Sequence, residues 1–223
     1  MIADTLEREY QTADLGNSAD PIEELIYICL TRQTHWQNAK RSWKALIEAG
    51  GPEAIARMPR DELQRLLQPS GFSHQKATWI QQALLAIRAR FGQLSLDGVR
   101  GWTDDTVDTF LRSLPGVSIK SAKCIMMYSL QRRVLPVDVH LRRIATRVGI
   151  VSNCRSERRI HNELESCVPA DHRYSLHVNA IWQGRKVCTA LEPRCELCAI
   201  RKLCDMGSTI QGSSSTSHAE VLA

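Results

Sequence analysis

Four cysteines near the end of the sequence have the spacing of metal ligands. Cys188, Cys195, Cys198 and Cys204 are separated by six, two and five residues, so all four fall within 17 residues. Thiolates this close together bind zinc or an iron–sulfur cluster. The residues between them are mostly polar or charged, which argues against four thiols that are merely buried in a core. The spacing predicts a metal centre, and the thiolate chemistry alone leaves zinc and iron–sulfur open.

The other four cysteines do not suggest a disulfide-stabilised protein. Cys29, Cys124, Cys154 and Cys167 are scattered, and the first two fall within apolar helical patterns, as buried thiols often do. The segment MIADTLEREY lacks the basic and apolar parts of a secretion signal, and no apolar run approaches the roughly 20 residues of a membrane span. We therefore expect a cytoplasmic protein, nucleoid-associated if bacterial, whose reduced thiols favour a metal site.

A turn followed by a lysine offers a second kind of chemistry. The segment LPGVSIKSA, residues 114–122, lies between two helical patterns, and its Pro-Gly pair predicts a tight turn leading into a helix. Such a helix start exposes backbone N–H groups that bind anions, and Gly116 permits close approach. Lys120 falls in the first turn, where the helix dipole disfavours a cation, so its amine is a candidate nucleophile. The alternative is a lysine that only contacts phosphate.

Asp138 is the carboxylate that such a nucleophile could use. A carboxylate can stabilise developing positive charge and help to move protons. Asp138 also directly precedes a helical pattern, which suits a helix N-cap, and one residue can serve both purposes.

Positive charge is concentrated around these two residues. The chain has 29 basic and 24 acidic residues, a net charge of +5. Between Arg112 and Arg159 eleven basic residues accompany two acidic ones, so this stretch carries +9 and the rest of the chain −4. A basic stretch with acidic flanks favours binding to a polyanion such as nucleic acid. A solvated helix surface would have the same composition.

The elements that must position these residues are helices. Apolar residues recur at spacings of three and four, and the period-two runs typical of strands are absent. The clearest patterns cover residues 22–30, 77–91, 122–130 and 141–148, and Asp20-Pro21 marks one helix start. We predict an all-α protein of about ten helices, with a disordered Ser/Gly-rich tail over residues 208–223.

In order and spacing, these motifs resemble those of endonuclease III-like DNA glycosylases of the helix–hairpin–helix superfamily. Residues 114–122 resemble the hairpin motif Leu-Pro-Gly-Val-Gly-x-Lys-[Thr/Ser]-Ala, and residues 137–140 resemble Val-Asp-Thr-His. Further matches are residues 30–34, Gly71-Phe72 with Lys76-Ala77, Gly184-Arg185, and the cysteine spacing. The resemblance covers the chain from about Pro21 to Cys204.

The resemblance implies two helical domains that flank a DNA-binding cleft. Residues 21–132 would form a six-helix barrel with the helix–hairpin–helix. Residues 133–207 would form an iron–sulfur domain with one [4Fe–4S] cluster, and residues 1–20 would pack on it. The implied activity is removal of damaged bases, chiefly oxidised pyrimidines, from double-stranded DNA, with cleavage at the abasic site. We expect a monomer.

The resemblance also implies roles for single residues. Lys120 would form a Schiff base with the sugar, and Asp138, supported by His140, would face it across the cleft. Gln33 would fill the space left in the duplex, unless it is an ordinary helix-surface residue. Phe72 would wedge into the base stack, unless it is a core residue. The remaining implied DNA contacts are Leu114, Gly116, Val117, Ser118, His140 and Arg194.

Several positions depart from the family pattern or select among its branches. Ser118 replaces the second hairpin glycine, Val139 replaces the threonine, and Arg32 adds a bulky cation beside Gln33. Adenine-removing relatives carry a glutamate where this chain has Ile28, and monofunctional relatives lack the lysine at position 120, so a bifunctional glycosylase–lyase is favoured. Two alternatives stay open: a damaged-DNA-binding module with weak or lost catalysis, and a zinc-stabilised helical adaptor that does not bind DNA.

Overall fold

The computed structural model describes residues 1–152 and 156–209 of the 223-residue chain. This part of the chain is helical without any β-strand, so the all-α prediction is confirmed. Its α-helices are α1 (Ile2–Tyr10), α2 (Pro21–Thr31), α3 (Trp36–Glu48), α4 (Gly51–Arg57), α5 (Arg60–Leu67), α6 (Ser73–Phe91), α7 (Asp104–Ser113), α8 (Ile119–Tyr128), α9 (Val139–Val148), α10 (Glu157–Cys167), α11 (Arg173–Lys186) and α12 (Asp205–Thr209). Short 3-10 helices are η1 (Gln68–Ser70), η2 (Asp97–Val99), η3 (Ala170–His172), η4 (Cys195–Leu197) and η5 (Arg201–Leu203). Within the described ranges, no helix is long and apolar enough to cross a membrane.

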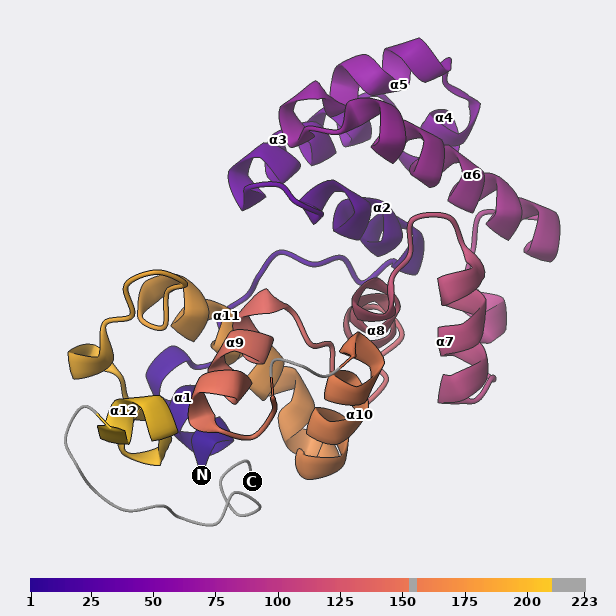
Figure 1. Cartoon of the computed structure of the whole chain (residues 1–223). Coiled ribbons are helices and arrows are strands. Elements are labelled where there is room, and N and C mark those ends of the chain that lie inside the picture. The colour runs from indigo at the N-terminus through magenta and orange to yellow at the C-terminus, as the bar shows by residue number, and fades with distance from the viewer. Residues whose placement is uncertain (153–155, 210–223) are drawn as a thin grey trace. The chain divides into compact units, whose positions relative to one another are not determined.

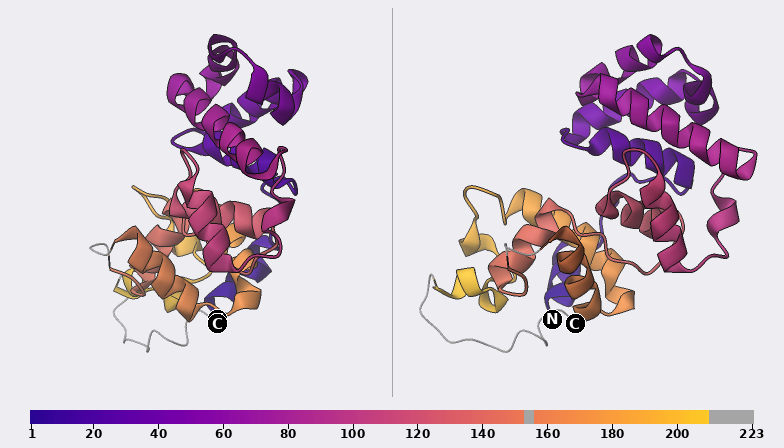
Figure 2. Two further views of the ribbon diagram at one scale, coloured as in Figure 1. Left: turned by 90° about the vertical axis from the view of Figure 1, so that its right-hand side faces the viewer. Right: turned by 45° about the vertical axis from the view of Figure 1, so that its right-hand side comes forward.

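The helices form two compact units (Figures 1 and 2). The central unit is Asn17–Arg132 and contains α2 to α8. The split unit combines Met1–Gly16 with the described chain from Arg133 onward, so that it contains α1 and α9 to α12. In Figure 1 the split unit accordingly joins the indigo start of the chain to its orange and yellow end.

The central unit is built around α2. Its residues are almost all buried, and it packs against α3, α6 and α8. The helix starts where the sequence predicts, because the Asp20 side chain accepts hydrogen bonds from the backbone N–H groups of Ile22 and Glu23, and Pro21 occupies the first turn. The loop that carries Gln33 therefore begins at the end of a buried helix.

The split unit is built around α11. This helix packs against α1 and α9, and its core joins Ile2 and Leu6 of α1 to Leu141 of α9 and Leu176 of α11. Polar contacts add to this packing, since the Tyr10 hydroxyl donates to Gln183 Oε1 at 2.6 Å. The first helix of the chain is therefore held in place by one that follows it by more than 160 residues.

The predicted tail begins slightly too early. Ser208 and Thr209 are the last residues of α12, because the Ser208 N–H donates to Cys204 O at 2.8 Å and extends the helix. Gly207 packs so closely on the preceding turn that a Cβ there would lie 2.7 Å from Arg201 O. The rest of the predicted tail, residues 210–223, and Cys154 lie outside the described residues.

Candidate functional site

Lys120 lies in the first turn of α8, directly after a tight turn. The Val117 N–H donates to Leu114 O at 3.2 Å, and Gly116 has a φ of 80°, as the Pro-Gly pair predicts. Ser118 is the N-cap of α8, where its hydroxyl accepts a hydrogen bond from the backbone. The serine at the expected glycine position therefore stabilises the helix start. Lys120 is half-buried at the positive end of the helix dipole.

A buried carboxyl on α2 interacts electrostatically with Lys120. Glu24 is fully buried, and its oxygens accept hydrogen bonds from Asn17 Nδ2 at 2.5 Å and from the Ser18 N–H at 2.8 Å. Burial raises the pKa of Glu24 to about 7, although these hydrogen bonds and Lys120 act in the opposite direction. A carboxyl that titrates near neutral pH therefore interacts with the candidate nucleophile, and the sequence reasoning missed it.

Arg32 links the hairpin turn to other segments of the central unit. Its guanidinium donates to Gly116 O and lies over the Trp79 ring, 4.6 Å from the ring centroid. A Cβ at position 116 would lie 2.7 Å from Trp79 Cγ, so the turn can approach the ring only as glycine. Because the guanidinium is bound to the hairpin, the cation expected beside Gln33 is engaged within the protein. No local pattern reveals this contact between residues 84 positions apart.

Gln33 and Phe72 lie in two loops of the central unit, and both are exposed. Gln33 follows the end of α2 with a φ of 49°, and Phe72 precedes α6 with a φ of 48°. Left-handed backbone is uncommon for residues other than glycine, and residues strained in this way cluster at functional sites. Phe72 is 64% exposed, which excludes the alternative of a core residue. Gln33 lies beyond the helix, so it is not an ordinary helix-surface residue either.

Asp138 is the N-cap of α9, so the capping role is present. Its Oδ1 accepts hydrogen bonds from the backbone N–H groups of His140 at 2.9 Å and Leu141 at 2.8 Å. His140 thus supports Asp138 through its backbone, while its ring Nδ1 lies 3.1 Å from a guanidinium nitrogen of Arg143. Burial lowers the pKa of His140, which keeps the ring neutral at physiological pH. Val139 between them is 71% exposed.

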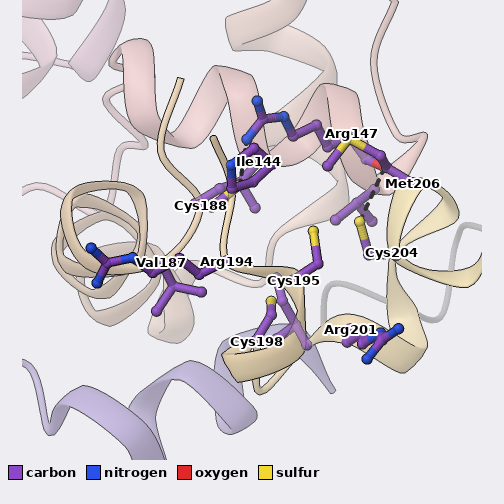
Figure 3. Close-up of a pocket in the computed structure, with 14 residues that line it drawn as sticks. Ile144, Arg147, Val187, Cys188, Arg194, Cys195, Cys198, Arg201, Cys204 and Met206 are labelled. Atoms are coloured by element: carbon purple, nitrogen blue, oxygen red, sulfur yellow. Dashed lines mark hydrogen bonds between the residues drawn. The ribbon is translucent and has the colours of Figure 1, made fainter. Parts of the chain in front are cut away.

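The four predicted cysteine ligands line one cavity of the split unit (Figure 3). Gln183 Nε2 donates to Cys198 Sγ, and a guanidinium nitrogen of Arg147 donates to Cys188 Sγ, each at 3.1 Å. Burial raises the pKa of the Cys198 and Cys204 thiols, and the nearby Cys188 adds to both shifts. Within the described ranges no three His, Cys, Asp or Glu side chains are grouped as ligands of a single metal ion.

Two arginines of α9 bind the segment that carries the four cysteine ligands, residues 188–204, called the cysteine loop below. Arg143 Nε donates to Cys188 O at 2.8 Å, and Arg147 donates to Thr189 O at 2.7 Å and Ala190 O at 2.9 Å. The helix that Asp138 caps is therefore also bound to the backbone of the cysteine loop. Arg194, the implied DNA contact on that loop, is exposed.

The basic stretch is not one free surface. Besides Arg143 and Arg147, Arg112 pairs with Asp108 at 3.1 Å, and Arg132 donates to backbone carbonyls of the central unit. These arginines contribute positive charge, but their guanidinium groups are engaged within the protein. Composition alone could not distinguish them from residues that face solvent.

The candidate residues are distributed over both units. Lys120, the hairpin, Gln33 and Phe72 belong to the central unit. Asp138, the cysteines and Arg194 belong to the split unit.

Comparison with known proteins gives consistent similarities. Residues 26–170 match the family of HhH-GPD superfamily base excision DNA repair proteins. The chain is 27% identical over 187 residues to Endonuclease III of Thermotoga maritima, a match that covers 83% of each protein. It is 26% identical over 202 residues to Endonuclease III of Synechocystis sp., with 90% of this chain and 84% of the relative covered.

Solved structures show the same similarity. An Endonuclease III in a non-covalent complex with DNA superposes with a TM-score of 0.80 and 25% identity, over 93% of this chain and 94% of the other. A thermostable thymine-DNA glycosylase has the same fold, with a TM-score of 0.76 and 20% identity over 93% of this chain and 95% of the other.

Proposed function

The chain belongs to the HhH-GPD superfamily of base excision DNA repair proteins, and we propose that it is an endonuclease III-like DNA glycosylase with abasic-site lyase activity. Its substrate is double-stranded DNA that contains damaged bases, chiefly oxidised pyrimidines, or abasic sites. The observation that carries the proposal is the position of Lys120, in the first turn of the helix that follows the hairpin. There an amine lies beside backbone N–H groups suited to a DNA phosphate.

Lys120 is the proposed nucleophile. The lone pair of its Nζ forms a bond to C1′ of the sugar, while the base leaves with the electrons of the glycosidic bond and gains a proton. Opening of the sugar ring gives a Schiff base between Lys120 and C1′. Its positive charge acidifies the proton at C2′, so loss of that proton expels the 3′ phosphate with the electron pair of the C3′–O bond. Water then releases the lysine.

Asp138 is the proposed charge stabiliser for base release. A carboxylate lowers the energy of the positive charge that develops on the sugar, and it can pass a proton. The hydrogen bonds from His140 and Leu141 orient this carboxylate at the start of α9. A side chain fixed in this way needs little reorganisation during the reaction.

The exposed loop residues are the proposed DNA contacts. Phe72 would enter the base stack when the damaged nucleotide is turned out, and Gln33 would occupy the space it leaves. The hairpin residues Leu114, Gly116, Val117 and Ser118 would hold a phosphate through their backbone, while His140 and Arg194 would contact DNA from the split unit.

The cysteine loop is proposed to hold one [4Fe–4S] cluster. Four thiols line one cavity, and N–H donors reach two of their sulfurs, which suits cysteine ligands that carry negative charge. When bound, the cluster would cross-link the loop that Arg143 and Arg147 attach to α9. We propose no catalytic step through it.

Borohydride trapping tests the lyase proposal. Reduction of the Schiff base links the protein to abasic DNA, so the parent protein should give a trapped adduct and a cleaved strand. Lys120→Ala should give neither, and Lys120→Arg, which keeps the charge, should also give neither. Binding of both variants to a non-cleavable abasic analogue should persist. An adduct formed by Lys120→Ala at the parent rate would show that another amine is the nucleophile.

The second candidate function is damaged-DNA binding without efficient catalysis. The exposed apolar side chain of Val139, where a threonine is usual, favours it, because a hydroxyl beside Asp138 is missing. Such a protein would bind the abasic analogue but give no trapped adduct even in its parent form.

A further inference from the structure

A buried ammonium group lies beneath the loops that carry Gln33 and Phe72. Lys76 on α6 is 1% exposed. Its Nζ donates to Leu30 O at 2.8 Å, Thr34 Oγ1 at 2.6 Å and Ser70 O at 2.7 Å. An ammonium has three N–H donors, so these acceptors satisfy all of them.

The three acceptors belong to two separate segments of the central unit. Leu30 and Thr34 lie on either side of Gln33, and Ser70 lies two residues before Phe72. The Thr34 hydroxyl also contacts Ser70 O directly. Charge-assisted hydrogen bonds are stronger than neutral ones, so Lys76 is a strong link between the two segments.

The two segments share a backbone feature that requires support. Gln33 and Phe72 have φ values of 49° and 48°, in a region that side chains other than glycine disfavour. Such residues persist only where the surrounding structure holds them. The bonds from Lys76 hold both segments, while the side chains of Gln33 and Phe72 remain exposed.

Stability alone is a poor explanation for a lysine here. Burial lowers the pKa of Lys76 to about 8. The nearby Cys29 acts to raise this pKa, and Arg32 acts to lower it. A charged group that is harder to protonate in the folded state makes folding less favourable at neutral pH. An apolar side chain would avoid this effect, but it could not donate to three acceptors on two segments.

We propose that Lys76 is a positioning residue that couples the loop of Gln33 to the loop of Phe72, so that both side chains meet a damaged duplex as one preformed surface. The inference rests on the proposed function, because it assigns these loops to lesion recognition. The coupling itself is a property of the free protein, and it can be tested there.

Hydrogen exchange in the absence of DNA tests the coupling. Thr34→Val keeps the side-chain size and removes the hydroxyl that Lys76 and Ser70 share. Thr31→Val is the matched control, since the Thr31 hydroxyl bonds Ile28 O within its own helix at 2.9 Å. Amide exchange over residues 31–35 and 69–73 should rise together by about tenfold in Thr34→Val and stay unchanged in the control. An increase in one segment alone, or in neither, would overturn the coupling.

Binding measurements test what the coupling does. Lys76→Met removes all three donors from a side chain of similar length. In Lys76→Met and Thr34→Val, the preference for an abasic-analogue duplex over undamaged duplex should fall by about tenfold, with undamaged binding nearly constant. Folded variants that keep the parent preference contradict the role in recognition. A parent protein without any preference contradicts the proposed function instead, while the exchange result still decides the coupling. If Lys76→Met does not fold, Thr34→Val decides both.

Discussion

Gly184 on α11 lies directly against the imidazole ring of His140 on α9. A Cβ at position 184 would lie 2.5 Å from His140 Nδ1, closer than non-bonded atoms approach. Arg143 of α9 adds a hydrogen bond to the same residue, since its guanidinium donates to Gly184 O at 2.9 Å. The missing side chain thus lets α9, with Asp138 at its start, pack closely on α11.

Gly184→Ala should therefore displace His140. We expect a loss of about 1–3 kcal/mol of unfolding free energy, as for overpacking elsewhere, together with slower base release. Gly101→Ala is a suitable control, because a Cβ there meets no atom within 4 Å. Thermal unfolding and single-turnover kinetics measure the two effects, and a Gly184→Ala protein indistinguishable from the control would refute the role of this contact.

Asp138→Asn should separate chemistry from folding. Asparagine is as good an N-cap as aspartate, so the melting temperature should hardly change. Base release should slow by more than about tenfold, or about 1.4 kcal/mol of barrier, because the negative charge is lost. Cleavage of a preformed abasic site should suffer less, since the base has already departed. Equal slowing of both steps would point to a general defect in the site.

Phe72→Ala should weaken lesion binding without affecting stability. Stacking on bases contributes about 1–3 kcal/mol per base, so affinity for the lesion duplex should fall by that amount. Phe72 is 64% exposed, hence its removal should leave the melting temperature unchanged. Leu85→Ala, on the helix that Phe72 precedes and 51% exposed, serves as control. Equal losses on lesion and undamaged duplex would argue against a wedge.

Glu24 should make stability fall as pH rises toward neutrality. Its pKa is raised from 4.5 to about 7, so the folded protein binds an extra proton between these values. The resulting stabilisation is complete below pH 4.5 and is lost as pH rises through 7; it is at most about 3 kcal/mol. Glu24→Gln should remove this dependence in urea unfolding, whereas Glu23→Gln should retain it. A parent profile that is flat over this range would contradict the raised pKa.

The proposed cluster predicts the metal content of the purified protein. A [4Fe–4S] centre requires about four irons per chain and gives a brown colour. Cys198→Ser should lower both the iron content and the melting temperature, while Cys167→Ser, an exposed cysteine of the same unit, should change neither. A colourless protein with stoichiometric zinc would overturn the assignment.

What the sequence predicts well is local. The helical period, the Asp20-Pro21 start of α2 and the turn before Lys120 depend on residues a few positions apart. The signals that define the family are also short motifs at fixed spacing. Such patterns are readable because backbone preferences act over single turns.

What the sequence hides are contacts between distant segments. The motif that contains Lys76 does not reveal that this lysine is buried in phase with Ile80 and Ile87 of α6, or that it bonds residues more than 40 positions away. The basic stretch likewise conceals that Arg147 serves the cysteine loop. Composition counts charges, whereas the fold decides which of them remain available to a ligand.

The helices that pack together in the split unit are synthesised at different times. α1 leaves the ribosome about 160 residues before α11, the helix it packs against. At 5–20 residues per second, α1 waits roughly 8–30 s for this partner. During that interval Ile2, Ala3 and Leu6, which the finished protein buries, lack the cover that α11 provides. The central unit, a continuous segment, is complete before α11 appears. Until α11 appears, the apolar face of α1 is therefore accessible to chaperones and proteases.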